Sequence, residues 1–389
     1  MEKSADAVVI GGGIMGASAA HFLAKKGIGK VVLLEKRTLA AVSTGHSAAN
    51  LRCAYSNSVT VQLALRAFEM FENDREELGG DTGFRRTGMM ILLGEAHVEM
   101  GRKILQIEKE HHTETKEIRP EEIKELAPQL NLDGVVCATY QSRGGYANPR
   151  QTTQTLVQQA AKWGLSAYEG IGARKIQLDD NRVSGVESDQ GSISTRLVIN
   201  AAGPWGYDVG ASAGCDYSIR WSRECDLVLR LPPDFGHFPI VADPDCHIYF
   251  RPQAENYLLA GLDYPKEIEP LDINDYDANL DTNSRQRIEQ GLFRRIPALR
   301  NADFDHGWAS IYTITDDWHP VVGPEPGIEG YYACFGGSGH GFKLGAPIGE
   351  SLADLITGHK PKIDIHALRP SRFKEGALFA SAWGDGNRA

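Results

Sequence analysis

The sequence predicts an α/β fold of two or three domains, α+β over the whole chain. Three observations favour this fold class. The chain has 389 residues, with 42% hydrophobic and 24% charged side chains, which is an ordinary globular composition. Residues 7–35 follow a pattern of strand, glycine turn, helix and strand. The 42 glycines exceed average usage without a Gly-X-Y period, which indicates tight turns or close backbone approach to a ligand.

Composition and charge exclude several classes of protein. The net charge of −10 argues against a protein that coats nucleic acid, because neutralising phosphates takes a basic face. No apolar run approaches the roughly 18 residues of a membrane helix, so we expect no membrane span. The first residues lead directly into a strand pattern and leave no room for a signal peptide. The six cysteines are scattered without a C-x-x-C pair, so we expect reduced thiols in a cytoplasmic protein and no metal site.

The first motif is a glycine-rich turn between a strand and a helix. Its parts are an apolar strand at 7–10, the G-x-G-x-x-G glycines Gly11, Gly13 and Gly16, a helix at 17–26, a strand at 31–34 and the acid Glu35. Such glycines let backbone N–H groups approach a pyrophosphate at the helix N-terminus. Glu35 can accept a hydrogen bond from a ribose hydroxyl. We therefore expect a Rossmann-like dinucleotide site here, although the motif alone does not separate NAD from FAD.

Three later segments help to discriminate the cofactor. A small-residue loop at 36–51 takes the place of the further βα units of an NAD dehydrogenase, and lets the backbone pass close to a flat ring system. A strand from residue 198 ends in a second glycine turn at Gly203. Four glycines within residues 336–341 precede a helix whose N-terminus would face an electron-rich group. The elements predicted around these segments are a helix at 58–78, hairpin strands at 185–191 and 193–198, and a helix at 346–356.

Taken together, these segments resemble the FAD-dependent D-amino-acid oxidase superfamily, in its branch of sarcosine oxidases, glycine oxidases and D-amino-acid dehydrogenases. The resemblance covers nearly the whole chain and implies FAD as the cofactor. It also implies a Rossmann-like FAD-binding domain built from residues 1–85, 145–215 and 320–389. A mixed β-sheet substrate-binding domain would comprise residues 86–144 and 216–319.

The resemblance implies a set of cofactor-binding residues in four regions. Those of the first motif are Gly11, Gly13, Ile14, Met15, Gly16, Glu35 and Lys36. Those of the small-residue loop beside the flavin are Ser43, Thr44, His46, Ser47, Ala48, Ala49 and Leu51. Ala173 lies on the adenine side, and Ala201, Gly203 and Trp205 belong to the second turn. The last region, near the N1–C2=O edge of the flavin, comprises Gly337, Gly339, His340, Gly341, Phe342 and Lys343.

The resemblance also implies the substrate and the chemistry. Arg52 and Lys343 match two basic residues that clamp a substrate carboxylate, which suits a small amine or amino acid. Tyr55 and Tyr249 match aromatic residues of the same pocket, and Arg223 is a further candidate partner of the carboxylate, as is Arg251. The implied reaction is hydride transfer from the carbon next to nitrogen to flavin N5, after which the imine hydrolyses; no dedicated base is needed. The acids Asp226, Asp243, Asp245 and Asp263 can recognise a cationic group, but nothing singles one out.

Two departures from the family pattern bear on the electron acceptor and on the flavin linkage. Leu259 stands where monomeric sarcosine oxidases carry a lysine that promotes reaction with oxygen. This favours a dehydrogenase slightly over an oxidase and leaves oxygen, a quinone or a partner protein as acceptor. The flavin-bearing cysteine of those oxidases is absent before Tyr312, so noncovalent FAD is favoured. The alternative is a covalent link at His46, because residues 43–46 are similar to the Ser-Thr-x-His of dimethylglycine and sarcosine dehydrogenases.

Two alternative functions stay open on this fold. One is a dehydrogenase of 2-hydroxyacids or polyols, since hydride transfer from C–OH needs much the same geometry. The other is the flavin subunit of a heteromeric amine dehydrogenase or oxidase. Two other histidine-bearing regions have weaker claims to a role: His111 and His112 in a charged helix predicted over 108–117 with a solvated face, and His319 at the rim of the pocket.

Overall fold

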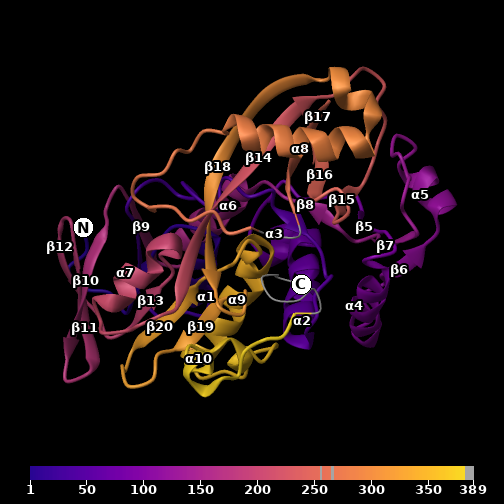
Figure 1. Ribbon diagram of the computed structural model, residues 1–389. Coiled ribbons are helices and arrows are strands. Elements are labelled where there is room, and N and C mark those ends of the chain that lie inside the picture. The colour runs from indigo at the N-terminus through magenta and orange to yellow at the C-terminus, as the bar shows by residue number, and fades with distance from the viewer. Residues whose placement is uncertain (255, 264–266, 382–389) are drawn as a thin grey trace.

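The computed structural model describes residues 1–254, 256–263 and 267–381, so a few residues of the predicted domain ranges lie outside the described residues. Two large β-sheets form the body of the described chain, with helices packed against them (Figure 1). Two smaller sheets of three strands accompany them. The predicted α/β fold class with a mixed sheet is confirmed.

The first large sheet collects strands that lie far apart in the sequence. Its order is β19-β20-β13-β1-β2-β9, and all neighbours pair in parallel except β19, which is antiparallel to β20. Its strands are β1 Ala7–Ile10, β2 Val31–Glu35, β9 Leu165–Glu169, β13 Val198–Asn200, β19 Val321–Pro324 and β20 Tyr331–Phe335. β1 is buried throughout, as expected of a central parallel strand covered on both faces. The carboxyl ends of the parallel strands therefore meet at one edge of this sheet.

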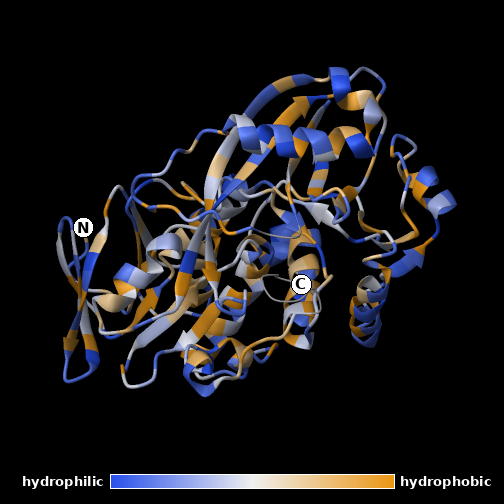
Figure 2. Ribbon diagram, viewed as in Figure 1, coloured by the Kyte–Doolittle hydropathy of each residue, from blue (hydrophilic) through white to orange (hydrophobic). Residues whose placement is uncertain are grey.

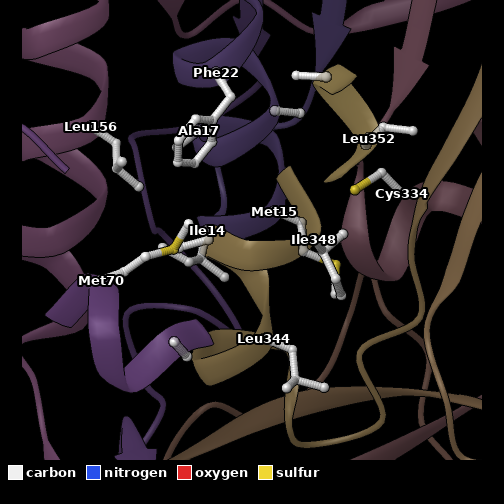
Figure 3. Packing of buried hydrophobic residues seen from close by; sticks show 14 of the residues in the cluster. Ile14, Met15, Ala17, Phe22, Met70, Leu156, Cys334, Leu344, Ile348 and Leu352 are labelled. Carbon is white, nitrogen blue, oxygen red and sulfur yellow. The ribbon is translucent and has the colours of Figure 1, made fainter. Parts of the chain in front are cut away.

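Two helices pack against each other beside this sheet. They are α1 Ile14–Lys25 and α9 Gly341–Ile356. Figure 3 shows Met15 of α1 beside Ile348 of α9. The close approach depends on missing side chains, because a Cβ on Gly349 would lie 2.6 Å from the carbonyl carbon of Ser18. This packing brings the N-termini of α1 and α9 to the same side of the molecule.

The second large sheet is nearly all antiparallel. Its order is β18-β14-β17-β16-β15-β5-β7-β6, and β15 with β5 is its parallel pair. Its strands are β5 Met89–Leu93, β6 Lys116–Ile118, β7 Cys137–Gln141, β14 Ile219–Arg230, β15 Ile240–Asp243, β16 Ile248–Gln253, β17 Tyr257–Leu262 and β18 Asp303–Thr315. Helix α8 Thr282–Arg295 covers one face through Ile288 and Leu292. Figure 2 shows α8 as mostly hydrophilic, with more hydrophobic strands beneath it.

The remaining elements of the described chain are two small sheets, seven helices and three short 3₁₀ turns. The sheets are β10-β11-β12, made of Ala173–Asp179, Arg182–Ser188 and Gly191–Ser194, and β3-β8-β4, made of Asn50–Leu51, Gly145–Tyr146 and Arg85–Arg86. The other helices are α2 Ser58–Glu72, α3 Asp74–Glu77, α4 Val98–Glu110, α5 Pro120–Leu126, α6 Pro149–Ala161, α7 Gly206–Ala211 and α10 Arg372–Glu375, with three short 3₁₀ turns at Gly203–Trp205, Pro297–Asn301 and His366–Leu368. In the part of the chain that the structure describes, no helix has the length and apolarity to cross a membrane. All six cysteines are buried and none forms a disulfide.

Several predicted boundaries were wrong, each for a local reason. Helices α1 and α9 begin at Ile14 and Gly341, earlier than predicted, because the N–H groups of a first turn need no helical partner and glycine is tolerated there. The predicted helix at 58–78 is interrupted at Asn73, whose φ of −118° and ψ of 40° are not helical.

The predicted charged helix at 108–117 was also wrong. Helix α4 ends at Glu110, and strand β6 begins at Lys116. Glu108 lies on the inward face of α4 with 1% of its surface exposed, and it accepts a hydrogen bond from the Thr115 hydroxyl at 2.9 Å. Burial raises the pKa of Glu108 to about 7, so this acid does not belong to a solvated face.

Candidate functional site

A first cavity, here called the outer cavity, opens at the carboxyl ends of β1, β2 and β13. Its volume is about 310 Å³. The residues of the sequence prediction that line it are Gly11, Gly13, Glu35, Lys36, Ser43, Thr44, Ala173, Ala201, Gly203 and Trp205. Ligands bind at this edge of open α/β sheets because loops and helix N-termini meet there. The outer cavity is therefore the expected place for the phosphate and nucleoside part of a dinucleotide.

A second cavity, the inner cavity, lies between elements of the two large sheets and has a volume of about 210 Å³. The residues of the sequence prediction that line it are Gly13, Ile14, Met15, Ser43, Thr44, His46, Ser47, Ala48, Ala49, Arg52, Ala201, Gly203, Tyr249, Gly337, Gly339, Gly341, Phe342 and Lys343. Five residues line both cavities: Gly13, Ser43, Thr44, Ala201 and Gly203. The two cavities thus share a wall, and one extended ligand can occupy both.

Both helix N-termini at the inner cavity lack side-chain caps. Gly13 is the N-cap of α1 and His340 that of α9, neither side chain caps its helix, and neither first turn carries an acid. At α1, the N–H of Ile14 donates to the Thr44 hydroxyl at 3.1 Å. Uncapped helix N-termini offer N–H donors and a positive dipole end to an anionic group. The same feature at both helices fits a ligand with negative charge at two points.

Glu35 and Lys36 lie at the outer cavity in different environments. The carboxylate of Glu35 accepts hydrogen bonds from the N–H of Gly12 and from that of Arg37, each at 2.7 Å. The ammonium of Lys36 lies 3.3 Å from the ring centroid of Trp205, a cation–π contact. Burial, and secondarily the charge of Arg37, lowers the pKa of Lys36 to about 8. Glu35 is thus held against the glycine turn, and Lys36 lies flat on an aromatic ring.

The small-residue loop is fastened to strand β18. The Ser43 hydroxyl donates to the carbonyl of Ile311 at 2.6 Å, and the indole N–H of Trp308 donates to the carbonyl of His46 at 3.1 Å. Nδ1 of His46 lies 3.1 Å from the carbonyl of Val42 and must donate to it, which leaves the lone pair on Nε2. Burial, and then the charge of Arg150, lowers the pKa of His46 below its ordinary value. The loop therefore presents a neutral imidazole at the inner cavity.

Two cationic side chains reach the inner cavity. Arg52 follows β3, and its guanidinium carbon lies 4.6 Å from the ring centroid of Tyr55. Lys343 belongs to the first turn of α9 and is 7% exposed. Among the described lining residues these two are the lysine and arginine side chains. The two residues that the sequence predicts as a carboxylate clamp thus line the same cavity.

The second sheet contributes acidic and aromatic groups to the same cavity. Glu224 and Asp226 of β14, Tyr249 of β16 and Asp263 after β17 line it. The Tyr249 hydroxyl donates to Oδ1 of Asp226 at 2.5 Å. The apolar part of this wall includes Met89 and Ile91 of β5 and Ala242 of β15. The cationic side chains of the inner cavity therefore come from α9 and the segment after β3, and the acidic ones from the second sheet.

Five residues of the sequence prediction do not line either cavity. These are Gly16, Leu51, Tyr55, Arg223 and His340. Leu51 and Tyr55 belong to the hydrophobic core, and His340 is fully buried with its ring 5.5 Å from that of Tyr55. A Cβ on Gly16 would overlap the carbonyl of Gly11, so this glycine permits the turn to fold against its own helix. These five residues do not themselves form the walls of the two cavities, and their roles stay predictions.

Arg223, Arg251 and His319 have structural partners instead. Arg223 forms an ion pair with Asp281 at 2.7 Å. Arg251 is 3% exposed, and its Nε donates to the carbonyl of Ala48 at 2.8 Å, which ties strand β16 to the small-residue loop. His319 is buried, and burial lowers its pKa to about 4. None of the three lines a cavity.

The sequence interpretation missed several lining residues. They include Asn50, Met89, Ile91, Glu224, Ser310 and Thr313. Glu224 and Asp226 alternate on one strand, which places both on one face and was a usable signal. The hydroxyl of Ser310 is buried with no hydrogen-bond partner among the described residues. Such an atom at a cavity wall fits a polar atom of a ligand.

The chain matches one family model and is similar to several known proteins. The family model described as DAO, FAD dependent oxidoreductase, matches residues 6–355. Mitochondrial sarcosine dehydrogenase of Mus musculus is 28% identical over 397 aligned positions, covering 98% of this chain and 43% of the relative. Mitochondrial dimethylglycine dehydrogenase of Rattus norvegicus is 27% identical, covering 95% of this chain and 45% of the relative. The chain thus spans less than half the length of these curated relatives.

A solved structure is similar over its whole length. L-proline dehydrogenase from P. horikoshii has a TM-score of 0.91 and 28% identity, covering 97% of this chain and 100% of that one.

Proposed function

The chain belongs to the DAO family of FAD-dependent oxidoreductases, and from this premise we propose that it oxidises a small amine that carries a carboxylate. The substrate class is a secondary or N-methyl amino acid or a D-amino acid. Bound FAD would accept a hydride at N5 from the carbon next to nitrogen, and water would hydrolyse the resulting imine. The observation that carries this proposal is the presence of both Arg52 and Lys343 on the wall of the inner cavity.

The residues present fit FAD. Two helix N-termini whose N-cap residues make no capping bond face the inner cavity, and the buried Ser310 hydroxyl at its wall has no hydrogen-bond partner among the described residues. Residues of the outer cavity, Glu35 among them, would hold the adenosine part. The α1 N-terminus would hold the pyrophosphate, and the loop at 43–49 with the α9 N-terminus would hold the flavin. When bound, FAD supplies a two-electron acceptor for the hydride.

The chain's own residues bind and orient the substrate. Arg52 offers a planar donor fork and Lys343 a point charge, and together they suit a small carboxylate. The guanidinium of Arg52 lies over the ring of Tyr55 and donates to the carbonyl of Ala54, and these two contacts restrict its position. Met89, Ile91 and Phe342 exclude water from part of the cavity. Because the carboxylate end is fixed, the carbon next to nitrogen is held in one orientation.

We propose a dehydrogenase with noncovalent FAD. Leu259 of β17 is 1% exposed and brings no charge where sarcosine oxidases carry a lysine. A cation near the flavin favours electron transfer to oxygen, so its absence at this position favours a quinone or a partner protein as acceptor. His46 keeps the alternative of a covalent bond open in chemical terms, since its Nε2 carries the lone pair.

Anaerobic bleaching of the flavin tests the proposed function. The holoprotein is mixed without oxygen with N-methylglycine, D-alanine and proline, and separately with glycolate and lactate. Bleaching by at least one of the amino acids supports the proposal. Bleaching by hydroxyacids alone would replace it with a 2-hydroxyacid dehydrogenase. Inactivity with all probes, together with a fixed copurifying chain, would replace it with the flavin subunit of a heteromeric enzyme.

A further inference from the structure

Three neighbouring strands of the second sheet place one pair of side chains over a glycine. Asp226 of β14 and Tyr249 of β16 are both register partners of Gly261 on β17. A Cβ on Gly261 would overlap Oδ1 of Asp226 and lie 2.8 Å from the ring of Tyr249. Strand β17 thus has no side chain at the point where the side chains of β14 and β16 meet above it. The sheet holds Asp226 and Tyr249 in contact above Gly261.

The hydrogen bond between the two side chains fixes the polarity of the phenol. The hydroxyl of Tyr249 donates to Oδ1 of Asp226 at 2.5 Å. A tyrosine hydroxyl has one proton, and in this pair that proton is donated to the carboxyl oxygen. Any further group must donate to the phenol oxygen or to the carboxylate. A substrate carboxylate cannot do so, whereas the N–H of an amine or ammonium can.

The acidic side chains of the inner cavity lie on the same sheet as this acceptor pair, as a partner with an N–H group requires. Glu224 and Asp263 line the cavity with Asp226, and all three come from β14 or from the end of β17. The cations Arg52 and Lys343 come instead from the segment after β3 and from α9. Separate elements therefore supply the partners for the two charges of a zwitterion.

We propose that Tyr249 and Asp226 form an acceptor pair that binds the substrate nitrogen, and that this pair selects amines over nitrogen-free carboxylates. This deepens the function proposed above and rests on it. The resemblance implies only that Tyr249 belongs to the pocket; the proposal gives this residue a role at the amine end of the substrate. Gly261 is a positioning residue, because it keeps the space in which the pair forms.

The test compares an amine ligand with a ligand that lacks nitrogen. The amine probe is whichever of N-methylglycine, D-alanine and proline bleaches the wild-type flavin fastest. The nitrogen-free probe is methylthioacetate, whose dissociation constant is read from the perturbed flavin spectrum. The variants are Tyr249→Phe, Asp226→Asn and Gly261→Ala, each purified with its FAD content measured. Matched controls are Tyr257→Phe and Asp216→Asn, which alter residues that line neither cavity.

The expected result is a selective loss. Tyr249→Phe and Asp226→Asn raise KM for the amine about 10- to 100-fold while the dissociation constant of methylthioacetate changes less than about twofold. Gly261→Ala shows the same selectivity, and both controls resemble the wild type. Equal weakening of both probes would overturn the acceptor pair and leave the proposed function standing. Failure of every amine to bleach the wild type would overturn the proposed function and, with it, this inference.

Discussion

The carboxylate of Glu35 accepts a hydrogen bond from the backbone N–H of Gly12 at 2.7 Å. Its other oxygen accepts from the N–H of Arg37 at the same distance. The end of β2 is thereby fastened to the turn that follows β1. A single acid thus shapes the glycine turn and lines the outer cavity, where the proposed ribose would lie.

We expect Glu35→Gln to weaken FAD binding about 10-fold or more, because the charged acceptor for a ribose hydroxyl is lost. Fluorescence titration of the apoprotein with FAD measures the affinity. Glu169→Gln is a matched control, since Glu169 also accepts a backbone N–H, that of Leu39 at 2.7 Å, but lines neither cavity. Equal affinities in the two variants would contradict the role given to Glu35.

The carboxylate clamp makes a prediction about substrate binding. Arg52→Ala and Lys343→Ala should each raise KM by the equivalent of about 1.5–3 kcal/mol, the usual value of a hydrogen bond to a charged group. Steady-state kinetics with the bleaching amine measures this change. Lys362→Ala is the control, because Lys362 pairs with Glu350 away from the cavities. An unchanged KM in both cavity variants would remove the clamp.

The flavin linkage is open to a direct check. Because noncovalent FAD is proposed, acid precipitation should leave a yellow supernatant and a colourless pellet. His46→Ala should then purify with flavin. A yellow pellet in the wild type that becomes colourless in His46→Ala would establish the covalent link at His46 instead.

The contact between α1 and α9 predicts a loss of stability. In Gly349→Ala the new methyl group would meet the backbone of Ser18, so the two helices must move apart. We expect a destabilisation of about 1–3 kcal/mol in denaturant unfolding, as for other overpacked cores. Gly80→Ala, where a Cβ meets the end of the Thr155 side chain at 3.0 Å, should be close to the wild type. Similar unfolding curves for both variants would refute the close packing.

Because Glu108 is buried, we expect the stability of the folded chain to depend on pH. Below its ordinary pKa of 4.5 the carboxyl is protonated in the folded and unfolded chain alike. As the pH rises toward 7 the unfolded chain ionises first, because burial raises the folded pKa to about 7, so folding loses stability over this range. Glu108→Gln should therefore gain about 1–3 kcal/mol relative to the wild type between pH 4.5 and 7.

The control for this experiment is Glu110→Gln, which changes an exposed acid at the end of the same helix. The free energy of unfolding is measured in denaturant at several pH values. A difference between Glu108→Gln and the wild type that stays constant with pH would contradict the buried, protonated state of Glu108.

The sequence predicted those parts of the site that belong to a motif with a fixed spacing of residues. The turn at Gly11–Gly16 with Glu35 could be predicted because this motif stands next to the strand and helix that position it. The pair Arg52 and Lys343 was predicted from the family resemblance alone. The inward position of Glu108 could not be predicted, since its partner Thr115 lies beyond the end of the helix. The contact of Asp226 with Tyr249 depends on the register of three strands. No local pattern contains that register.

In the proposed reaction, an amine held by its carboxylate in the inner cavity is oxidised by FAD. The most direct measurement is anaerobic stopped-flow bleaching of the holoprotein by N-methylglycine, proline and D-alanine, each compared with its decarboxylated amine. We predict saturable bleaching by at least one amino acid and, for its decarboxylated counterpart, a rate at equal concentration that is at least about 10-fold lower. Equal bleaching by the amine with and without its carboxylate, or bleaching only by hydroxyacids, would contradict the account.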